Sequence, residues 1–306
     1  MIEHIIALDD QPAHLSTRNA LLVIRRAAGE TTVPLSEVAV LLISNPVVTL
    51  TQAVLAGLAD AGGVLVACDR RHMPAAMLLP LQANFAQAER FVQQTRVSLP
   101  RRKRLWQAVV KSKISAQGAV LRALYGDDAG LSRLAAAVRS GDTGNAESEA
   151  ARRYWPRLFA DPAFHRDREA DDENRLLNYG YAVLRAIVAR AVCAAGLHPS
   201  LGLHHHNRYN AFCLADDLME PFRPIVDRAV VQLCHARGRT PPLDKEAKAT
   251  LLGALLGRFP VAGAGHRTEL RSLFDIASML AASLVGIFAG ERKALILPQW
   301  WAGPHP

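Results

Sequence analysis

The sequence predicts an α+β protein in which a small N-terminal β-sandwich, residues 1–80, precedes a larger all-helical domain, residues 81–306. Two observations lead to this prediction. Short β-rich or alternating runs, bounded by Asp, Asn, Gly and Pro, fill the first 80 residues. After Pro80 the apolar residues recur with a period of about 3.6 and form few β-branched clusters, which is typical of helices.

Short strands and one helix are expected in the N-terminal part. The helix covers Leu50–Ala61, where apolar residues have helical spacing, and Gly62-Gly63 ends it. The strands carry few charges, so their sheet is a candidate pairing surface for a second copy of the chain. They are expected at Ile5–Leu8, Ala20–Arg25, Val38–Ile43 and Gly63–Ala67.

The helical part is expected to run almost to the end of the chain. Gly126, Gly141, Gly196 and Gly290 stand where helices should stop. Pro298 to Pro306, rich in Pro and aromatic residues, is expected to be a mobile tail. The predicted helices cover residues 85–97, 101–125, 129–138, 146–159, 172–195, 212–236, 243–257 and 267–289.

The composition is ordinary for a globular protein, with half of the 306 residues apolar. Four scattered cysteines without a CxxC pair predict reduced thiols in a cytoplasmic protein. Glu3, Asp9 and Asp10 interrupt any apolar N-terminal run, so no signal segment is expected. The uncharged stretch Ile276–Gly290 is 15 residues long, which is short for a membrane span and suits a buried helix.

Positive charge is concentrated after the β-rich part. Residues 1–80 hold five arginines against seven acidic residues, whereas the whole chain has a net charge of +8. A local excess of basic residues favours a polyanion such as nucleic acid, because each neutralised phosphate releases counterions. A solvated basic helix face is the alternative explanation. Between residues 85 and 115 only Glu89 opposes Arg90, Arg96, Arg101, Arg102, Lys103, Arg104, Lys111 and Lys113.

A carboxylate stands on the apolar face of the helix expected over residues 146–159. Glu147, Ala150, Ala151, Tyr154 and Leu158 share one face at helical spacing. An inward carboxylate is costly unless a cation or a metal satisfies it, so Glu147 is a candidate site residue. A first-turn Glu that complements the helix macrodipole is the alternative, and the local pattern alone favours it.

The segment 202–224 combines histidines with a pair of acids. Neighbours in an extended backbone point in opposite directions, so one or at most two residues of His204–His206 could bind one ion. Asp217 and Glu220 are three residues apart, which places both on one face if the stretch is helical. Pro221 requires that a helix start close by, with Asp216 as its cap, or kink there. Surface histidines before an acid-capped helix are the alternative.

A polar stripe runs along the helix expected over residues 172–195. Asn174, Asn178, Tyr181 and Arg185 follow each other at spacings of four, three and four, while the opposite side is apolar. The stripe is either the solvated side of the helix or a set of groups that orient phosphates or a DNA strand. The sequence favours neither interpretation.

Several motifs resemble, in order and spacing, those of the CRISPR adaptation integrases, the “Cas one” subunit. Residues 147–155, E-S-E-A-A-R-R-Y-W, resemble that family's E-G-x-A-A-x-x-Y-F segment, and Gly202–His205 matches its G-x-x-H element. Asn178–Tyr181, with Leu184, resembles N-Y-G-Y-x-x-L. The most specific motif is 217–224, D-L-M-E-P-F-R-P, which resembles the shorter type II forms that work beside a Cas-nine effector.

The resemblance implies a fold and a metal site. The family has an N-terminal β-sandwich and a larger helical domain, and its metal ligands map onto Glu147, His205 and Glu220, with Asp217 beside them. Two carboxylates and one imidazole suit Mg²⁺ or Mn²⁺, and Zn²⁺ is less favoured because no cysteine lies near the cluster. Ser148 replaces the family's usual Gly, and His205 is chosen by counting from the G-x-x-H element.

The implied activity is the integration of new spacers. A 3′-hydroxyl of a short double-stranded DNA fragment attacks a phosphodiester of a CRISPR repeat, and water in its place gives endonuclease activity at the same site. The resemblance also implies a homodimer, bridged by the small “Cas two” subunit into a larger complex. A contact with the Cas-nine effector is a further expectation, and no membrane partner is expected.

The DNA contacts are expected at basic residues. The run Arg101, Arg102, Lys103 and Arg104 would hold the backbone of the fragment or the target. Arg208 and Arg223 flank the ligand segment and are candidate phosphate clamps, with ordinary ion pairs as the alternative.

Two other functions compete with integration: a stand-alone structure-specific nuclease in DNA repair, and a non-catalytic DNA-binding scaffold. Dependence on a small partner and on repeat DNA would distinguish an integrase from the repair nuclease. Metal-dependent turnover would exclude the non-catalytic scaffold.

Overall fold

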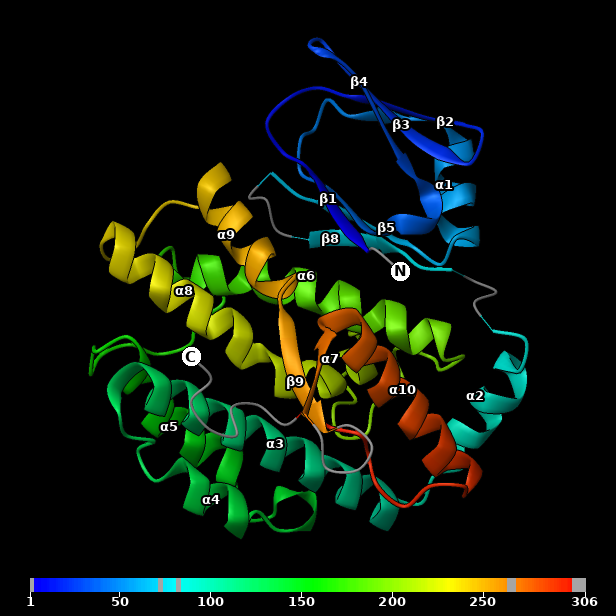
Figure 1. The fold of residues 1–306 in the computed structure, drawn as a ribbon. Coiled ribbons are helices and arrows are strands. Elements are labelled where there is room, and N and C mark those ends of the chain that lie inside the picture. The colour runs from blue at the N-terminus through cyan, green and yellow to red at the C-terminus, as the bar shows by residue number, and fades with distance from the viewer. Residues whose placement is uncertain (1–2, 71–73, 81–83, 263–267, 299–306) are drawn as a thin grey trace.

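The computed structural model describes residues 3–70, 74–80, 84–262 and 268–298 (Figure 1). Two four-stranded sheets occupy the N-terminal part of these residues, and helices with a two-stranded sheet form the remainder. The α+β class predicted from the sequence is confirmed. The second part is mainly rather than entirely helical, because it contains that small sheet.

The first sheet has the strand order β1-β5-β7-β8. Strand β5 (Val38–Ile43) is a continuous apolar run because both of its faces are buried. Leu41 faces the core between the two sheets, and Val40 and Leu42 face the helices. The first three strands run parallel and the last is antiparallel: β1 (His4–Leu8), β5 (Val38–Ile43), β7 (Val64–Cys68) and β8 (Pro74–Leu78).

The second sheet has the order β4-β3-β2-β6 and closes the sandwich. Leu15 and Leu22 from this sheet share a core with Leu41 of the first sheet and with Val54 of helix α1 (Gln52–Asp60). The short strand β6 runs parallel to β2, and the other pairings are antiparallel. The strands are β2 (His14–Arg18), β3 (Leu21–Arg26), β4 (Gly29–Pro34) and β6 (Thr49–Leu50).

A tight turn corrects the strand predicted over Ala20–Arg25. Asn19 and Ala20 have φ values of 51° and 61°, so Ala20 belongs to the two-residue turn between β2 and β3. Positive φ at both central residues is typical of the type I′ turn that suits the twist of a hairpin. Strand β3 therefore begins at Leu21, one residue later than predicted.

The helices surround one long buried helix, α6 (Glu173–Ala194), which packs against the first sheet on one side and against α7, α8, α9 and α10 on others (Figure 1). The remaining helices are α2 (Gln87–Thr95), α3 (Leu99–Tyr125), α4 (Leu131–Ala137), α5 (Ala146–Leu158), α7 (Cys213–Met219), α8 (Arg223–Arg237), α9 (Lys245–Leu255) and α10 (Leu273–Ala289).

Among the described residues, α6 is the one helix long and apolar enough to cross a membrane, and 83% of its apolar window is buried inside the fold. Its apolar character is explained by this central position. Gly180 allows α6 to approach α8 closely, because a Cβ there would lie 2.4 Å from Val226 Cγ1. This close crossing brings polar side chains of the two helices together at one edge of the cleft described below.

Two predicted helices differ from the structure. The segment predicted as one helix over 212–236 is broken into α7, a 3-10 turn (Glu220–Phe222) and α8, because Pro221 and Pro224 each begin a new helical segment. The start of the helix predicted over 267–289 is instead strand β10 (Thr268–Ser272), which pairs antiparallel with β9 (Arg258–Ala262). Residues 299–306 of the predicted mobile tail lie outside the described residues.

Candidate active site

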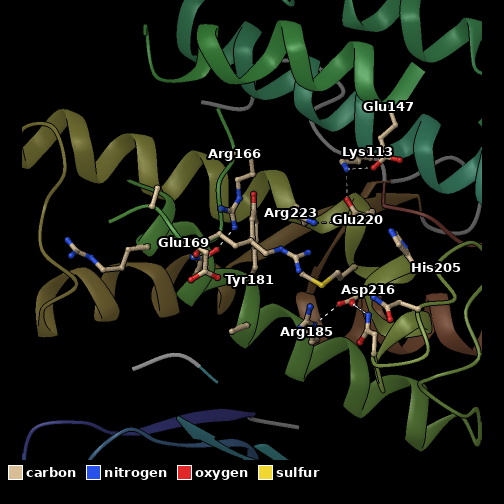
Figure 2. A pocket seen from close by; sticks show the side chains of 18 of the residues that line it. Lys113, Glu147, Arg166, Glu169, Tyr181, Arg185, His205, Asp216, Glu220 and Arg223 are labelled. Atoms are coloured by element: carbon tan, nitrogen blue, oxygen red, sulfur yellow. Dashed lines mark hydrogen bonds and ion pairs between the residues drawn. The ribbon is translucent and has the colours of Figure 1, made fainter. Parts of the chain in front are cut away.

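A polar cleft of about 960 Å³ lies among α3, α5, α6 and the segment 205–223 (Figure 2). It brings together residues that are far apart in the sequence. The cationic lining consists of Lys113, Arg166, Arg168, Arg175, Arg185 and Arg223; the acidic lining consists of Asp69, Glu147, Glu169, Asp171, Asp216 and Glu220.

Glu147 enters the cleft from the first turn of α5. The helix start is fixed by Asp142, whose carboxylate accepts hydrogen bonds from the backbone N–H groups of Ala146 (2.8 Å) and Glu147 (3.0 Å). Tyr154 and Leu158, on the same face, are fully buried. The inward direction inferred from the helix pattern is therefore the observed one. The Glu147 side chain is 29% exposed and meets a cation, Lys113.

Glu220 lies at the break between α7 and α8, where Pro221 turns the chain. Its side chain is 5% exposed, and its Oε1 accepts a hydrogen bond from Arg223 Nη1 at 2.8 Å. Its Oε2 is buried and accepts no hydrogen bond from the described residues. Burial by itself raises the pKa of this carboxyl, but the charges of Arg223 and Lys113 outweigh it and lower the pKa to about 2. Glu220 is therefore ionised at neutral pH.

Lys113 links the two carboxylates. Its Nζ lies 2.6 Å from Glu147 Oε1 and 2.5 Å from Glu220 Oε2 (Figure 2). The contact with Glu220 is an ion pair whose angles do not meet the criteria for a hydrogen bond. Desolvation lowers the pKa of a buried lysine, yet the two carboxylates raise the pKa of Lys113 overall. One cation thus occupies the space between Glu147 and Glu220.

His205 is positioned by Asp217, which is fully buried. Asp217 Oδ1 lies 2.6 Å from His205 Nδ1, and the same carboxylate accepts backbone N–H hydrogen bonds from Leu203, His204 and His205 at 2.6, 2.9 and 3.2 Å. Because an ionised carboxylate only accepts, Nδ1 is the donor, and Nε2 has no hydrogen-bond partner among the described residues. The hydrogen bond that His205 donates to Asp217 is also the main reason why the pKa of His205 is raised.

The loop that carries His205 requires a glycine at position 202. A Cβ at Gly202 would lie 2.2 Å from the carbonyl oxygen of His205 and 2.9 Å from Asp217 Oδ2. On its other side the loop packs on Trp106 of α3, which stacks with the His204 ring at 4.4 Å. The G-x-x-H pattern is therefore explained by a tight loop wrapped around one carboxylate.

The polar stripe of α6 is mostly not a solvated face. Asn174 and Tyr181 are buried, and Asn178 and Arg185 line the cleft. Arg166, from the irregular segment before α6, donates to the side-chain oxygens of Asn174 (2.6 Å) and Asn178. Arg185 Nε donates to Asp216 Oδ1 at 2.6 Å. The stripe thus arranges cations along the cleft.

Tyr181 supports two of these cations. Its hydroxyl donates to the buried Asp227, which also accepts from Tyr154 at 3.0 Å. The guanidinium carbons of Arg223 and Arg166 lie 4.1 and 5.4 Å from the centre of the Tyr181 ring. Contact with the ring holds both guanidinium groups beside the cleft, where planar cations suit the recognition of phosphate.

The basic residues predicted to contact DNA lie in two places. Arg223 is in the cleft. Arg101, Arg102, Lys103 and Arg104 are in the first turns of α3 and do not line the cleft, whose nearest α3 residue, Lys113, is about 13 Å further along the helix. Arg208 is on the exposed loop after His205, with its guanidinium 4.8 Å from the Tyr209 ring.

Three residues of the cleft were not predicted as such from the sequence: Lys113, Arg166 and Asp216. A signal for Lys113 exists, because it follows Trp106, Val109 and Val110 at helical spacing on a buried face of α3, and a lysine there needs an anion. Arg166 has no comparable signal, since it lies in a polar irregular segment.

The donor set fits Mg²⁺ or Mn²⁺, which bind carboxylate oxygen and tolerate imidazole. Glu220 has a buried oxygen without a hydrogen bond, His205 has a free Nε2, and a cation already lies between Glu147 and Glu220. Within the described part of the chain, no three His, Cys, Asp or Glu residues come close enough together to hold a metal. The candidate ligand set thus rests on the pair Glu147 and Glu220, which share a cation, and on His205, which lines the same cleft.

An acidic pair in an arginine-lined cleft is typical of enzymes that act on the phosphodiester backbone of nucleic acids. The family model for “CRISPR associated protein Cas1” matches residues 6–254. A CRISPR-associated endonuclease Cas1 from Neisseria meningitidis serogroup C is 36% identical over 287 residues, which are 93% of this chain and 92% of that protein. The chain belongs to the Cas1 family of CRISPR-associated proteins, which confirms the predicted class of DNA endonuclease and integrase.

Solved structures share the fold. A casposase bound to an integration product superposes with a TM-score of 0.74 at 19% identity, covering 95% of this chain and 92% of the casposase. A chain of a Cas6-RT-Cas1–Cas2 complex superposes with a TM-score of 0.73 at 18% identity, covering 99% of this chain and 36% of that longer chain. At these identities the likeness concerns the fold.

Proposed function

We propose that this chain inserts short DNA fragments into a CRISPR repeat array, with Glu147, His205 and Glu220 holding one Mg²⁺ or Mn²⁺ ion. The observation that carries this proposal is the shared cation: Lys113 Nζ lies within 2.6 Å of both Glu147 and Glu220. Two carboxylates gathered around one positive charge, beside a histidine with a free nitrogen, form the kind of donor set that a divalent ion prefers.

Each residue of the cleft has a role in this proposal. The bound ion would polarise the phosphodiester and lower the pKa of the attacking 3′-hydroxyl. Asp217 holds the His205 ring and fixes its tautomer, which would leave Nε2 available to bind the ion. Arg223 and Arg166, held over the Tyr181 ring, would bind the non-bridging oxygens of the reacting phosphate and stabilise the charge that develops there.

The same arrangement supports hydrolysis. Water in the place of the 3′-hydroxyl would cleave the strand, because the cleft offers the same phosphate contacts to either nucleophile. Nicking or cleavage of branched DNA is therefore expected as a second activity of this site. A stand-alone repair nuclease is the competing function, and it differs in needing neither a partner subunit nor repeat DNA.

The DNA is held beyond the cleft by the basic start of α3. Arg101, Arg102, Lys103 and Arg104 stand on the same helix as Lys113, and the exposed side chains of Lys103 and Arg104 are free to follow a phosphate backbone. Arg208 extends the positive surface on the loop after His205. Double-stranded DNA, as fragment and as repeat, is the proposed substrate.

The proposed assembly is a homodimer joined by the small Cas2 subunit. This proposal rests on family membership and on the likeness to a chain of a complex that contains Cas1 and Cas2. A contact with the Cas-nine effector is proposed on the type II form of the 217–224 motif. Mn²⁺ is placed beside Mg²⁺ because an imidazole ligand favours Mn²⁺ more than an all-oxygen shell does.

An integration assay tests the proposal. Labelled duplex with free 3′-hydroxyls is mixed with supercoiled repeat plasmid, Cas2 and Mn²⁺, and wild type is compared with Glu220→Ala. The expected result is label at the repeat borders with wild type and none with the variant. Degradation without transfer would favour the repair nuclease, and equal transfer by both proteins would exclude Glu220 from the site.

A further inference from the structure

Lys113 occupies the position that the proposed metal would need. Its Nζ contacts one oxygen of Glu147 at 2.6 Å and one of Glu220 at 2.5 Å. Mg²⁺ and many Mn²⁺ sites have carboxylate oxygens at about 2.0–2.2 Å, only a few tenths of an ångström shorter than these contacts. One gap between two carboxylates holds one cation, so the ammonium group and the metal exclude each other there.

A displaced Lys113 ammonium needs another anion. Its side chain is 15% exposed, so leaving it unpaired within the protein is costly. The nearby Arg223 repels it. The other acidic residues of the cleft already have interaction partners, as Asp216 has with Arg185 and Asp171 with Arg175, and as Asp69 and Glu169 also have. The anion that enters this cleft from outside is a DNA phosphate.

We propose that Lys113 exchanges partners during the reaction cycle: it holds Glu147 and Glu220 together before the metal binds, and contacts a phosphate oxygen of the DNA once the metal has replaced it. Metal binding without DNA then leaves a buried ammonium unpaired, whereas metal binding with DNA does not. The two ligands therefore bind cooperatively, and Lys113 is the residue that couples them. This inference rests on the proposed metal site.

The first test is the affinity for Mn²⁺ without DNA, measured by calorimetry on the full chain. Lys113→Met removes the competing charge and retains an apolar side chain of similar length, so we expect Mn²⁺ to bind about tenfold more tightly than to wild type. Lys113→Arg keeps a charge and is expected to bind Mn²⁺ no more tightly than wild type. Lys111→Met, on the same helix and outside the cleft, is the matched control and is expected to match wild type.

The second test is the coupling itself. The affinity for a fluorescent branched duplex without free 3′-hydroxyls is measured by anisotropy in EDTA and in Ca²⁺, which keeps the DNA intact. For wild type and Lys111→Met we expect Ca²⁺ to increase DNA affinity about tenfold, and for Lys113→Met less than about threefold, because linkage is reciprocal. Lys113→Gln, which has no charge but can donate to a carboxylate, is expected to behave as Lys113→Met and replaces it if the Met variant does not fold.

The outcomes separate this inference from the proposed function. If Glu147→Gln binds Mn²⁺ as wild type does, the metal site itself is wrong. If Glu147→Gln loses Mn²⁺ binding while Lys113→Met and Lys113→Gln bind Mn²⁺ no more tightly than wild type, the metal site stands and the exchange by Lys113 is overturned. Tighter Mn²⁺ binding together with lost coupling in the uncharged variants supports it.

Discussion

Asp217 fixes His205 through two contacts, one from the ring Nδ1 at 2.6 Å and one from the backbone N–H at 3.2 Å. The carboxylate is fully buried and also accepts the N–H groups of Leu203 and His204. Both oxygens of the Asp217 carboxylate thus accept hydrogen bonds from the loop that carries His205. These contacts support the proposal that Asp217 positions His205 rather than binding the metal.

Replacing Asp217 tests this role. Asp217→Asn removes the charge that orients His205, and loss of such an outer partner typically lowers metal affinity or activity about 10–100-fold. We expect a loss of this size in Mn²⁺ affinity and in strand transfer. Asp275→Asn, at the exposed start of α10, is the control and should leave both unchanged. Wild-type Mn²⁺ affinity in Asp217→Asn would contradict the positioning role.

Gly202→Ala tests the shape of the histidine loop. The new Cβ would lie 2.2 Å from the His205 carbonyl oxygen, so the loop must shift and the His205 ring must leave its position. We expect strand transfer to fall about 100-fold, because small displacements of positioned groups have effects of this order. Gly253→Ala, where the Cβ meets no atom within 4 Å, should keep full activity and gain about 0.5–1 kcal/mol of stability. Full activity in Gly202→Ala would show that the loop tolerates a side chain.

The buried Asp227 predicts a pH dependence of stability. Burial raises the pKa of this carboxyl from 3.8 to about 6, against the opposing effects of Tyr181 and Arg223. Because the folded protein holds this proton more tightly than the unfolded chain, Asp227 favours folding at low pH, and that contribution is lost as pH rises through about 6. Each pKa unit corresponds to about 1.4 kcal/mol, so the loss is a few kcal/mol.

Thermal unfolding of wild type and Asp227→Asn at pH 5 and pH 8 measures the part of this contribution that is lost above pH 5. Titrations common to both proteins cancel in the comparison. Wild type is expected to lose more stability than the variant between the two pH values. An equal change in both proteins would mean that Asp227 does not titrate with a raised pKa in the folded state.

Salt dependence tests the basic start of α3. DNA affinity should fall steeply with salt, with a logarithmic slope of about 0.9 per phosphate neutralised in duplex DNA. Changing Arg101, Arg102, Lys103 and Arg104 to Gln should lower that slope and weaken binding to all sequences alike. The measurement is anisotropy over a salt series. An unchanged slope would remove this segment from the DNA surface.

The elements that the sequence predicted well are those with an uninterrupted pattern. Strand β5 and helix α6 are long apolar runs because neighbours cover them on several sides. Strands β2, β4, β6 and β8 were missed: β2 and β4 are mostly polar, and β6 spans two residues. The β9–β10 pair was missed because β9 follows one predicted helix, β10 lies within the start of another, and the two strands depend on each other for pairing.

The parts of the candidate site that could be predicted are those where a charged residue interrupts an apolar pattern or where a motif resembles a known family. Glu147 stands on an apolar face, and the motif around Glu220 resembles a known family. The link between these two residues was not predictable, because Lys113 belongs to a basic run that the sequence analysis assigned to DNA binding as a whole. The spacing of Lys113 after Trp106 and Val109 indicates that it is buried on α3, but its distance from both carboxylates follows from tertiary packing alone.

The most direct test of the proposed metal site is a crystal structure of the full chain with Mn²⁺ and DNA, using the anomalous scattering of manganese to locate the ion. We expect one anomalous peak within about 2.3 Å of oxygens from Glu147 and Glu220 and of the His205 Nε2, with the Lys113 ammonium moved away from the carboxylates. An anomalous peak elsewhere in the molecule, with Lys113 still between Glu147 and Glu220, would contradict it.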